Sequence, residues 1–87
     1  MEMKISVPQY SKDTGVSFEW ESNFEIHTEA KDSCINIRAN KEGLISLAKI
    51  LLTLAGDEVP VGEHVHLDGY NSLEEGSVEL ILERAKL

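Results

Sequence analysis

Apolar and polar residues alternate along four segments in the first forty residues of the chain. Residues 3–7, 16–20, 24–28 and 35–39 each place their larger apolar side chains at every second position. This period of two is typical of half-buried β-strands, because successive side chains of a strand point to opposite faces of the sheet. The pattern therefore predicts four strands before residue 40.

The loops between these segments determine which side chains share a face. A three-residue loop at residues 21–23 pairs Phe18 with Ile26, and a four-residue loop at residues 30–33 pairs Ile26 with Ile37. A slip of one residue in either hairpin would move the apolar set to the opposite face. Both registers agree on one inner face, which consists of Val16, Phe18, Trp20, Phe24, Ile26, Ile35 and Ile37. We therefore expect an antiparallel meander.

One helix is predicted at Lys41–Ala55. Asn40 is a favoured N-cap residue, and Gly56 is a favoured residue just past a helix C-terminus. Leucines and alanines recur three and four positions apart and form one apolar stripe: Leu44, Leu47, Ala48, Leu51, Leu54 and Ala55. We expect this stripe, Leu51 included, to lie in the core. The narrow polar face should be wet, and it consists of Glu42, Ser46, Lys49 and Thr53.

Two further strands are predicted after the helix, at residues 64–68 and 77–84. The expected fold class is α+β: an antiparallel sheet of five or six strands in the order β-β-β-β-α-β-β, with one long helix on one face. We expect residues 1–87 to form a single domain, because ~60 residues can fold alone and most domains are longer than this chain.

The chain is strongly acidic, with eight Lys and Arg against sixteen Asp and Glu and a net charge of −8. Residues 57–87 are the most acidic part, whereas residues 31–56 carry more bases than acids. Nucleic acids and anionic membranes attract basic surfaces, so we expect no nucleic-acid partner and no membrane partner. No signal peptide or apolar span of ~20 residues is visible, and the lone Cys34 cannot form an internal disulfide. We therefore expect a cytoplasmic protein.

His64, His66 and Asp68 form the sharpest chemical pattern in the sequence. They share one face of a predicted strand, and His-x-His-x-Asp supplies metal ligands in metallo-β-lactamases. A zinc site needs three or four ligands around one ion, however, and His27 is the only other histidine. The simpler interpretation is a solvated strand face on which His66 lies opposite Glu79 and pairs with it. In that interpretation the protein has no metal and no other cofactor.

The connection before the last predicted strand is a candidate binding surface. It contains Tyr70 and the pair Glu74 and Glu75, and Asp68 precedes it. Loops often carry binding residues, and a tyrosine within a charged rim is typical of interface anchors. We therefore predict that Asp68, Tyr70, Glu74 and Glu75 bind a partner protein.

Three stretches of the second half resemble a known family. Residues 59–68 read Val-Pro-Val-Gly-Glu-His-Val-His-Leu-Asp, and residues 40–44 read Asn-Lys-Glu-Gly-Leu at the start of the predicted helix. Residues 73–77 read Leu-Glu-Glu-Gly-Ser. Together they resemble the small bacterial immunity proteins of type 32 from polymorphic toxin systems. The resemblance covers about residues 40–87, and residues 59–68 are its specific part.

The resemblance implies a non-enzymatic, cytosolic α+β protein that binds a bacterial toxin domain and neutralises it. It supplies no catalytic residues. The acidic charge adds the expectation that the cognate toxin is basic, as a nuclease that holds phosphates would be. Two alternatives stay open: a small metal-dependent hydrolase built on His64, His66 and Asp68, and an interaction domain that forms a homodimer through its apolar helix and has no toxin.

Overall fold

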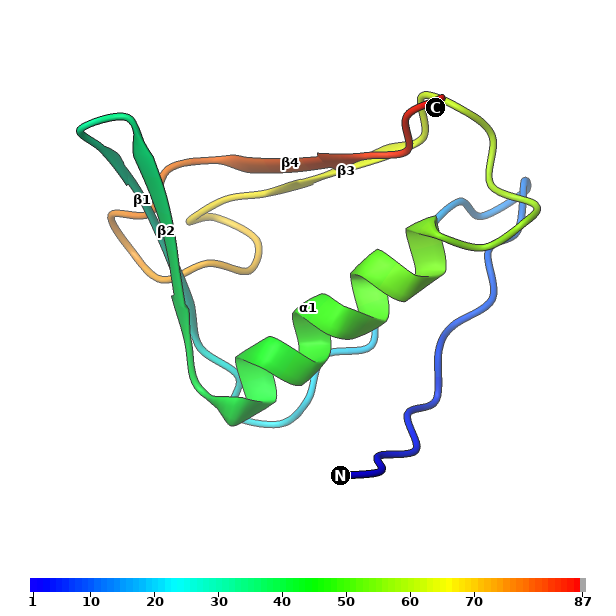
Figure 1. Cartoon of the computed structure of the whole chain (residues 1–87), viewed down its shortest axis with the longest axis horizontal. Helices are drawn as coiled ribbons and strands as arrows, with labels where there is room; N and C mark the ends of the chain where they lie inside the picture. The colour runs from blue at the N-terminus through cyan, green and yellow to red at the C-terminus, as the bar shows by residue number, and fades with distance from the viewer. Residues whose placement is uncertain (87) are drawn as a thin grey trace.

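The structure, a computed structural model, describes residues 1–86. The elements follow in the order β1 (Ile26–Lys31), β2 (Cys34–Ala39), α1 (Lys41–Leu54), β3 (His64–Leu67) and β4 (Leu80–Glu83). β1 pairs with β2 and β3 pairs with β4, so the strands form two separate two-stranded antiparallel sheets. In Figure 1 the two sheets and α1 form the three sides of a triangle.

The prediction of one sheet with five or six strands, in the order β-β-β-β-α-β-β, is therefore wrong. The α+β class holds, but residues 3–7 and 16–24 do not form strands. In the second of these segments the aromatic side chains pack on each other instead. The ring of Trp20 stacks on Phe24 with a centroid distance of 4.5 Å and on Phe18 with a distance of 5.6 Å.

The first predicted hairpin fails because another segment occupies the edge of β1 that it needed. The amide of Glu74 donates to the carbonyl oxygen of Ile26 over 2.8 Å, and the amide of Val78 donates to that of Thr28 over 3.1 Å. The Thr28 amide also donates to Ser77 Oγ. These bonds occupy the outward edge of β1 at Ile26 and Thr28, where residues 16–20 were predicted to pair.

The register of β1 and β2 also differs from the predicted one. The strands are joined by a two-residue turn, Asp32-Ser33, in which both residues have positive φ (52° and 61°). This conformation is typical of a type I′ hairpin turn. Ile26 consequently lies opposite Ala39 rather than Ile37. Because the shift is two residues, every side chain of the pair keeps its predicted face.

β3 and β4 show the same two-residue shift. Leu67 pairs with Leu80, and His66 lies opposite Ile81 rather than opposite Glu79. Glu79, the predicted partner of His66, is nevertheless in contact with it from a diagonal position on the neighbouring strand. His66 Nδ1 lies 3.2 Å from Glu79 Oε2. The contact between His66 and Glu79 is confirmed, although the pairing that predicted it is not.

α1 begins at the predicted residue, and its cap is confirmed. Asn40 Oδ1 accepts hydrogen bonds from the amides of Gly43 (2.7 Å) and Glu25 (3.0 Å), while Asn40 Nδ2 donates to the carbonyl oxygen of Asn23 (2.9 Å). One amide side chain thus joins the helix start, the segment that leads into β1 and the turn before it. At the other end, Arg84 Nη1 donates to the last helical carbonyl, that of Leu54, and to that of Gly56, over 2.8 Å each.

The buried face of α1 is rotated from the predicted one. Leu44 and Leu51 were expected in the core, but both are about half exposed. Ser46 and Thr53 were expected to be wet, but both are buried. The buried positions are Gly43, Ser46, Leu47, Ile50, Thr53 and Leu54.

The N-terminal part of the chain causes this rotation, because it lies over the polar side of α1. Ser46 Oγ donates to the carbonyl oxygen of Glu42 (2.8 Å) and accepts from the amide of Glu21 (2.9 Å). Thr53 Oγ1 donates to the carbonyl oxygen of Lys49 over 2.7 Å. Hydroxyl groups that have such partners can be buried without an unsatisfied polar atom. The buried core takes its side chains from β1, α1, β3 and the connections on either side of β3: Ile26, Leu47, Ile50, Leu54, Val59, Val65, Leu67 and Leu73.

Two titratable groups whose contacts fix the N-terminal part, Lys49 and Tyr10, predict how stability depends on pH. Lys49 Nζ lies 3.1 Å from Glu21 Oε2 and 3.4 Å from Glu19 Oε1, and the hydrogen bond to Glu21 is the main cause that raises the pKa of Lys49 above 10.5. Burial and a hydrogen bond to Glu63 raise the pKa of Tyr10 above 10.0. In both cases the native state keeps the proton up to a higher pH than the unfolded chain does.

The stability that these two groups contribute is therefore fully present below about pH 10 and lost as the pH rises through their native pKa values. Urea unfolding between pH 8 and 11.5 should show a decrease in the free energy of unfolding at the alkaline end. The decrease should be smaller in Lys49→Met and in Tyr10→Phe. An identical alkaline slope in the parent and both variants would contradict the assignment.

Candidate partner-binding surface

The predicted binding residues lie on the connection that follows β3, which Figure 1 shows in yellow and orange beside β1 and β2. Asp68 organises the start of this connection. Its Oδ1 accepts from the amides of Tyr70 (2.9 Å) and Asn71 (3.1 Å), and its carbonyl oxygen accepts from the amide of Leu73 (2.8 Å). An aspartate that bonds to amides two and three residues later forms an Asx-type turn. The Asp68 carboxylate therefore faces its own loop.

Asn71 fixes the same turn to the end of β3. Its Oδ1 accepts from the amide of Asp68 (3.0 Å), and its Nδ2 donates to the carbonyl oxygen of His66 (3.0 Å). Leu73 is buried in the core, and it holds the far side of the turn against the body of the protein. The turn is thus anchored at both ends.

Tyr70 lies at the tip of this anchored turn and is fully exposed to solvent. Its backbone amide is held by Asp68, but its ring packs on nothing. Burial of a tyrosine removes a large aromatic surface from water, so an exposed ring on a fixed backbone has much to gain from a partner. Tyr70 therefore does not pack down on the protein.

Glu74 and Glu75 are also exposed, on the return of the connection towards β4. The Glu74 backbone is bonded to Ile26, so this part of the loop runs along β1. The Glu74 side chain lines an open hollow of about 300 Å³ together with His27 and Arg38. The four predicted residues therefore share one connection; Tyr70, Glu74 and Glu75 are exposed, whereas Asp68 is half-buried and its Oδ1 is bonded to the loop.

The two histidines of the alternative metal site lie on the outer face of β3. His64 Nδ1 is 2.8 Å from the carbonyl oxygen of Gly62, and the two imidazole rings are 5.0 Å apart. Asp68 does not complete a ligand set with them, because its carboxylate is bonded to the loop amides. Within residues 1–86, no group of three His, Cys, Asp or Glu side chains is arranged to hold a metal ion.

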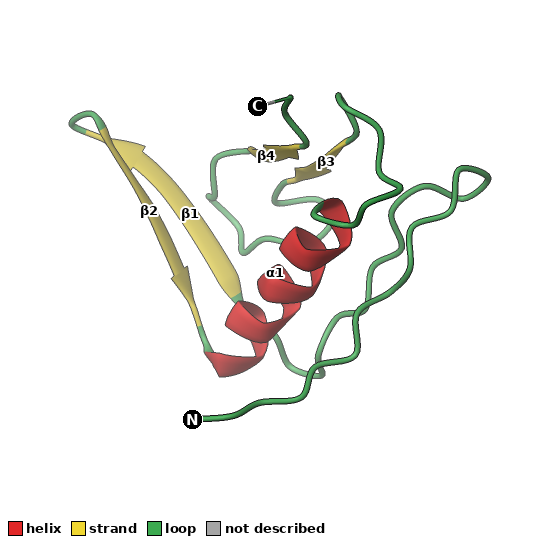
Figure 2. Cartoon of the chain, turned by 45° about the vertical axis from the view of Figure 1, so that its right-hand side comes forward, coloured by secondary structure: helices red, strands yellow, loops and turns green. Residues whose placement is uncertain are grey.

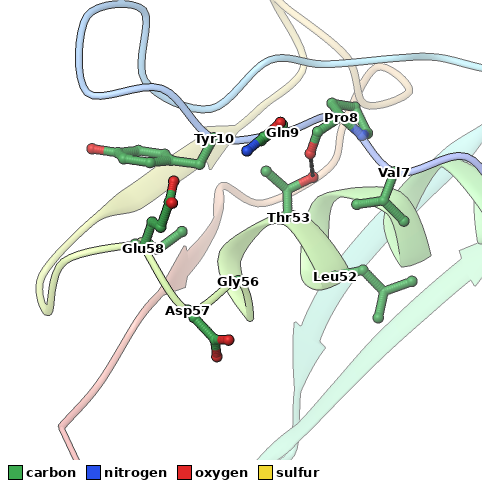
Figure 3. Close-up of a pocket in the computed structure, with 10 residues that line it drawn as sticks. Val7, Pro8, Gln9, Tyr10, Leu52, Thr53, Gly56, Asp57 and Glu58 are labelled. Carbon is green, nitrogen blue, oxygen red and sulfur yellow. Dashed lines mark hydrogen bonds between the residues drawn. The ribbon is translucent and has the colours of Figure 1, made fainter.

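A hollow of about 460 Å³ lies where the N-terminal segment crosses the end of α1, and Figure 3 shows the residues around it. Val7, Leu52 and Val59 contribute apolar walls, and Tyr10 and Glu58 lie at one end. The carbonyl oxygen of Pro8 lies 3.3 Å from Thr53 Oγ1. This hollow was missed from the sequence because residues 3–7 were predicted to form a strand.

The described part of the chain contains no helix with the length and apolar character that a bilayer-spanning segment requires. A family model described as immunity protein 32 matches residues 35–85, which is more than half of the chain. No curated protein and no solved structure matches.

Proposed function

Because the chain belongs to the immunity protein 32 family, we propose that it acts in the cytoplasm of a bacterium by binding a toxin domain and blocking it. The family points to a toxin-neutralising role, and such a role needs a binding surface rather than a reaction. We further propose that the whole chain is one binding domain and that the toxin is basic, as a nuclease would be.

The observation that carries the proposal is the exposed Tyr70 on a turn fixed by Asp68 and Asn71. A side chain whose backbone is already ordered loses less conformational entropy on binding, so more of the contact energy appears as affinity. Tyrosine is also among the residues that most often dominate binding energy. In this proposal Tyr70 is the anchor, Glu74 and Glu75 form its charged rim, and Asp68 shapes the turn.

The charge distribution supports a basic partner at this surface. Residues 57–87 carry eight acidic and two basic residues, whereas residues 31–56 carry two acidic and four basic residues. A toxin that holds nucleic acid needs a basic surface. The acidic part of this chain would attract that surface over a distance, and the attraction would weaken as salt screens it.

The test is a binding experiment with the product of the neighbouring toxin gene. The double reversal Glu74→Lys with Glu75→Lys should slow association about tenfold at low salt and flatten its salt dependence, because rim charges act mainly on the association rate. Tyr70→Ala should instead raise the dissociation rate about tenfold, a loss of about 1–2 kcal/mol. Surface plasmon resonance at 20, 100 and 300 mM salt measures both rates.

The matched control is Glu2→Lys with Asp13→Lys, which makes the same change in net charge at two exposed residues of the N-terminal segment. If both double variants slow association equally, net charge alone is responsible and the loop has no special role. If Tyr70→Ala binds like the parent as well, the toxin binds a different surface.

A further inference from the structure

β2 has an open edge. Its hydrogen-bonded neighbour is β1, whose own outer edge is covered by the backbone of Glu74 and Val78. No other strand of residues 1–86 pairs with β2. In Figure 2 the β1–β2 hairpin extends away from the rest of the molecule with β2 on its outer side. Open edges of this kind are templates for pairing with another chain.

The backbone groups at this edge can be identified from the register. The two-residue turn makes Lys31 and Cys34 a hydrogen-bonded pair, and the bond from the Asn40 amide to the Glu25 carbonyl oxygen (3.1 Å) continues the same alternation. The even-numbered residues of β2 therefore point their amides and carbonyls at β1. The amides and carbonyls of Ile35, Ile37 and Ala39 consequently point away from it, towards the open edge.

The side chains of the same strand leave apolar surface uncovered. Ile37 is directly opposite Thr28, and Ile35 is opposite Ala30, so both isoleucines lie on the face that Ile26 buries against α1. Yet Ile35 is 73% exposed and Ile37 is 43% exposed. An exposed apolar patch on a strand face is a mark of an interaction surface.

We propose that β2 pairs antiparallel with β2 of a second copy of this chain, which joins the two hairpins into a four-stranded sheet. In the best register Asn36 lies opposite Asn36 of the second copy. Ile35 of each copy then lies opposite Ile37 of the other. These are the residues whose backbone groups point outward, so the pair exchanges both backbone hydrogen bonds and buries its side chains together.

The charges of the strand favour a second copy over a basic toxin as the occupant. β2 carries Arg38 and no acidic residue, so it has nothing to attract a basic surface. In the proposed register Arg38 lies opposite Cys34 of the other copy, and no like charges face each other. The acidic residues 57–87 of two copies would still repel at a distance. Self-association should therefore strengthen with salt, whereas the proposed contact between Tyr70 and a toxin should weaken.

Sedimentation velocity over a concentration series tests the dimer on the intact chain. We expect a monomer–dimer equilibrium that shifts to dimer at higher salt and is lost in Ile35→Lys. Val61→Lys is the matched control, because Val61 is also an exposed apolar residue (61%) and lies in a loop away from β2. A monomer at all concentrations up to the millimolar range overturns the proposal, and so does a dimer that Ile35→Lys leaves intact. If the parent is a monomer and Ile35→Lys weakens toxin binding, the open edge of β2 belongs to the toxin interface, and the dimer proposal is overturned as well.

Cross-linking tests the register. In a Cys34→Ser background, Asn36→Cys places two cysteines at a non-hydrogen-bonded pair, where Cα atoms are about 4.5 Å apart and a disulfide can form. Arg38→Cys in the same background places them four positions apart along the strands, about 13 Å, which is too far. Mild oxidation should give a covalent dimer from the first variant only. A dimer from both or from neither rules out this register.

Discussion

Replacement of Gly43 by alanine is expected to destabilise the protein by at least about 2 kcal/mol, because it overpacks a closed contact. A Cβ atom at this position would overlap the carbonyl oxygen of Glu25 and lie 2.9 Å from Ile26 Cγ1 and 3.1 Å from Ala39 Cβ. Glycine is therefore what lets the first turn of α1 lie directly on the base of the β1–β2 hairpin. The clash involves backbone, so a change of rotamer cannot relieve it.

Helix propensity alone predicts the opposite sign. Alanine is better than glycine inside a helix by about 1 kcal/mol, so an exposed Gly43 would make the variant more stable. Thermal unfolding of Gly43→Ala distinguishes the two, and the expected decrease in Tm is about 10 °C or more for a domain of this size. Lys41→Ala, at an exposed position of the same turn, should change stability by less than about 0.5 kcal/mol. A higher Tm for Gly43→Ala would mean that the hairpin does not lie against α1.

Two neighbouring residues of α1 should respond very differently to truncation. Ile50→Ala should cost about 2–5 kcal/mol, because Ile50 is 2% exposed and the change leaves a cavity between α1 and the rest of the core. Leu51→Ala should cost less than about 1 kcal/mol, because Leu51 is 51% exposed and already contacts water over half of its surface. Urea unfolding of the two variants measures both values.

This pair tests the rotation of the helix face directly. The sequence pattern placed Leu51 in the core, and a buried Leu51 would make its truncation cost as much as that of Ile50. The exposed neighbour is also the control for helix propensity, since both changes introduce alanine in the same turn. Equal losses in the two variants would show that the N-terminal segment does not cover the side of α1 on which Ser46 and Thr53 lie.

The local signals of the sequence predicted local structure well. The cap at Asn40 and the start of α1 depend on residues within one helical turn, and both were correct. Alternation grouped the side chains of β1 and β2 by face correctly, because a shift of two residues does not change the face. Ile35 and Ile37, however, were expected on the inner face and are exposed. The exact pairing depends on the turn, and the Asp32-Ser33 turn is two residues shorter than the loop that was predicted.

The long-range errors have one physical origin. Which segment occupies the outer edge of β1 depends on a competition between residues 16–20 and residues 74–78, and alternation in the sequence cannot decide it. The same holds for α1. Ser46 and Thr53 look like a wet face in the sequence, which does not show that the N-terminal segment covers them, with the Glu21 amide bonded to Ser46 Oγ and the Pro8 carbonyl oxygen near Thr53 Oγ1. For the candidate site, the sequence placed Tyr70, Glu74 and Glu75 in one connection, but it could not show that Asp68 Oδ1 is bonded to the amides of its own loop.

The closure of the fold by residues 74–84 has a kinetic consequence. The outer edge of β1 is satisfied by a segment about fifty residues downstream, and the C-terminus of α1 is capped by Arg84. A growing chain can make the β1–β2 hairpin and α1 early, but their outer groups have no partners until residues 74–84 have been synthesised. Contacts between distant segments slow folding, because loop-closure entropy must be overcome before they form. The protein therefore completes this part of its fold only after residues 74–84 have been synthesised, and a chain that stops before residue 74 exposes an unpaired strand edge that favours aggregation.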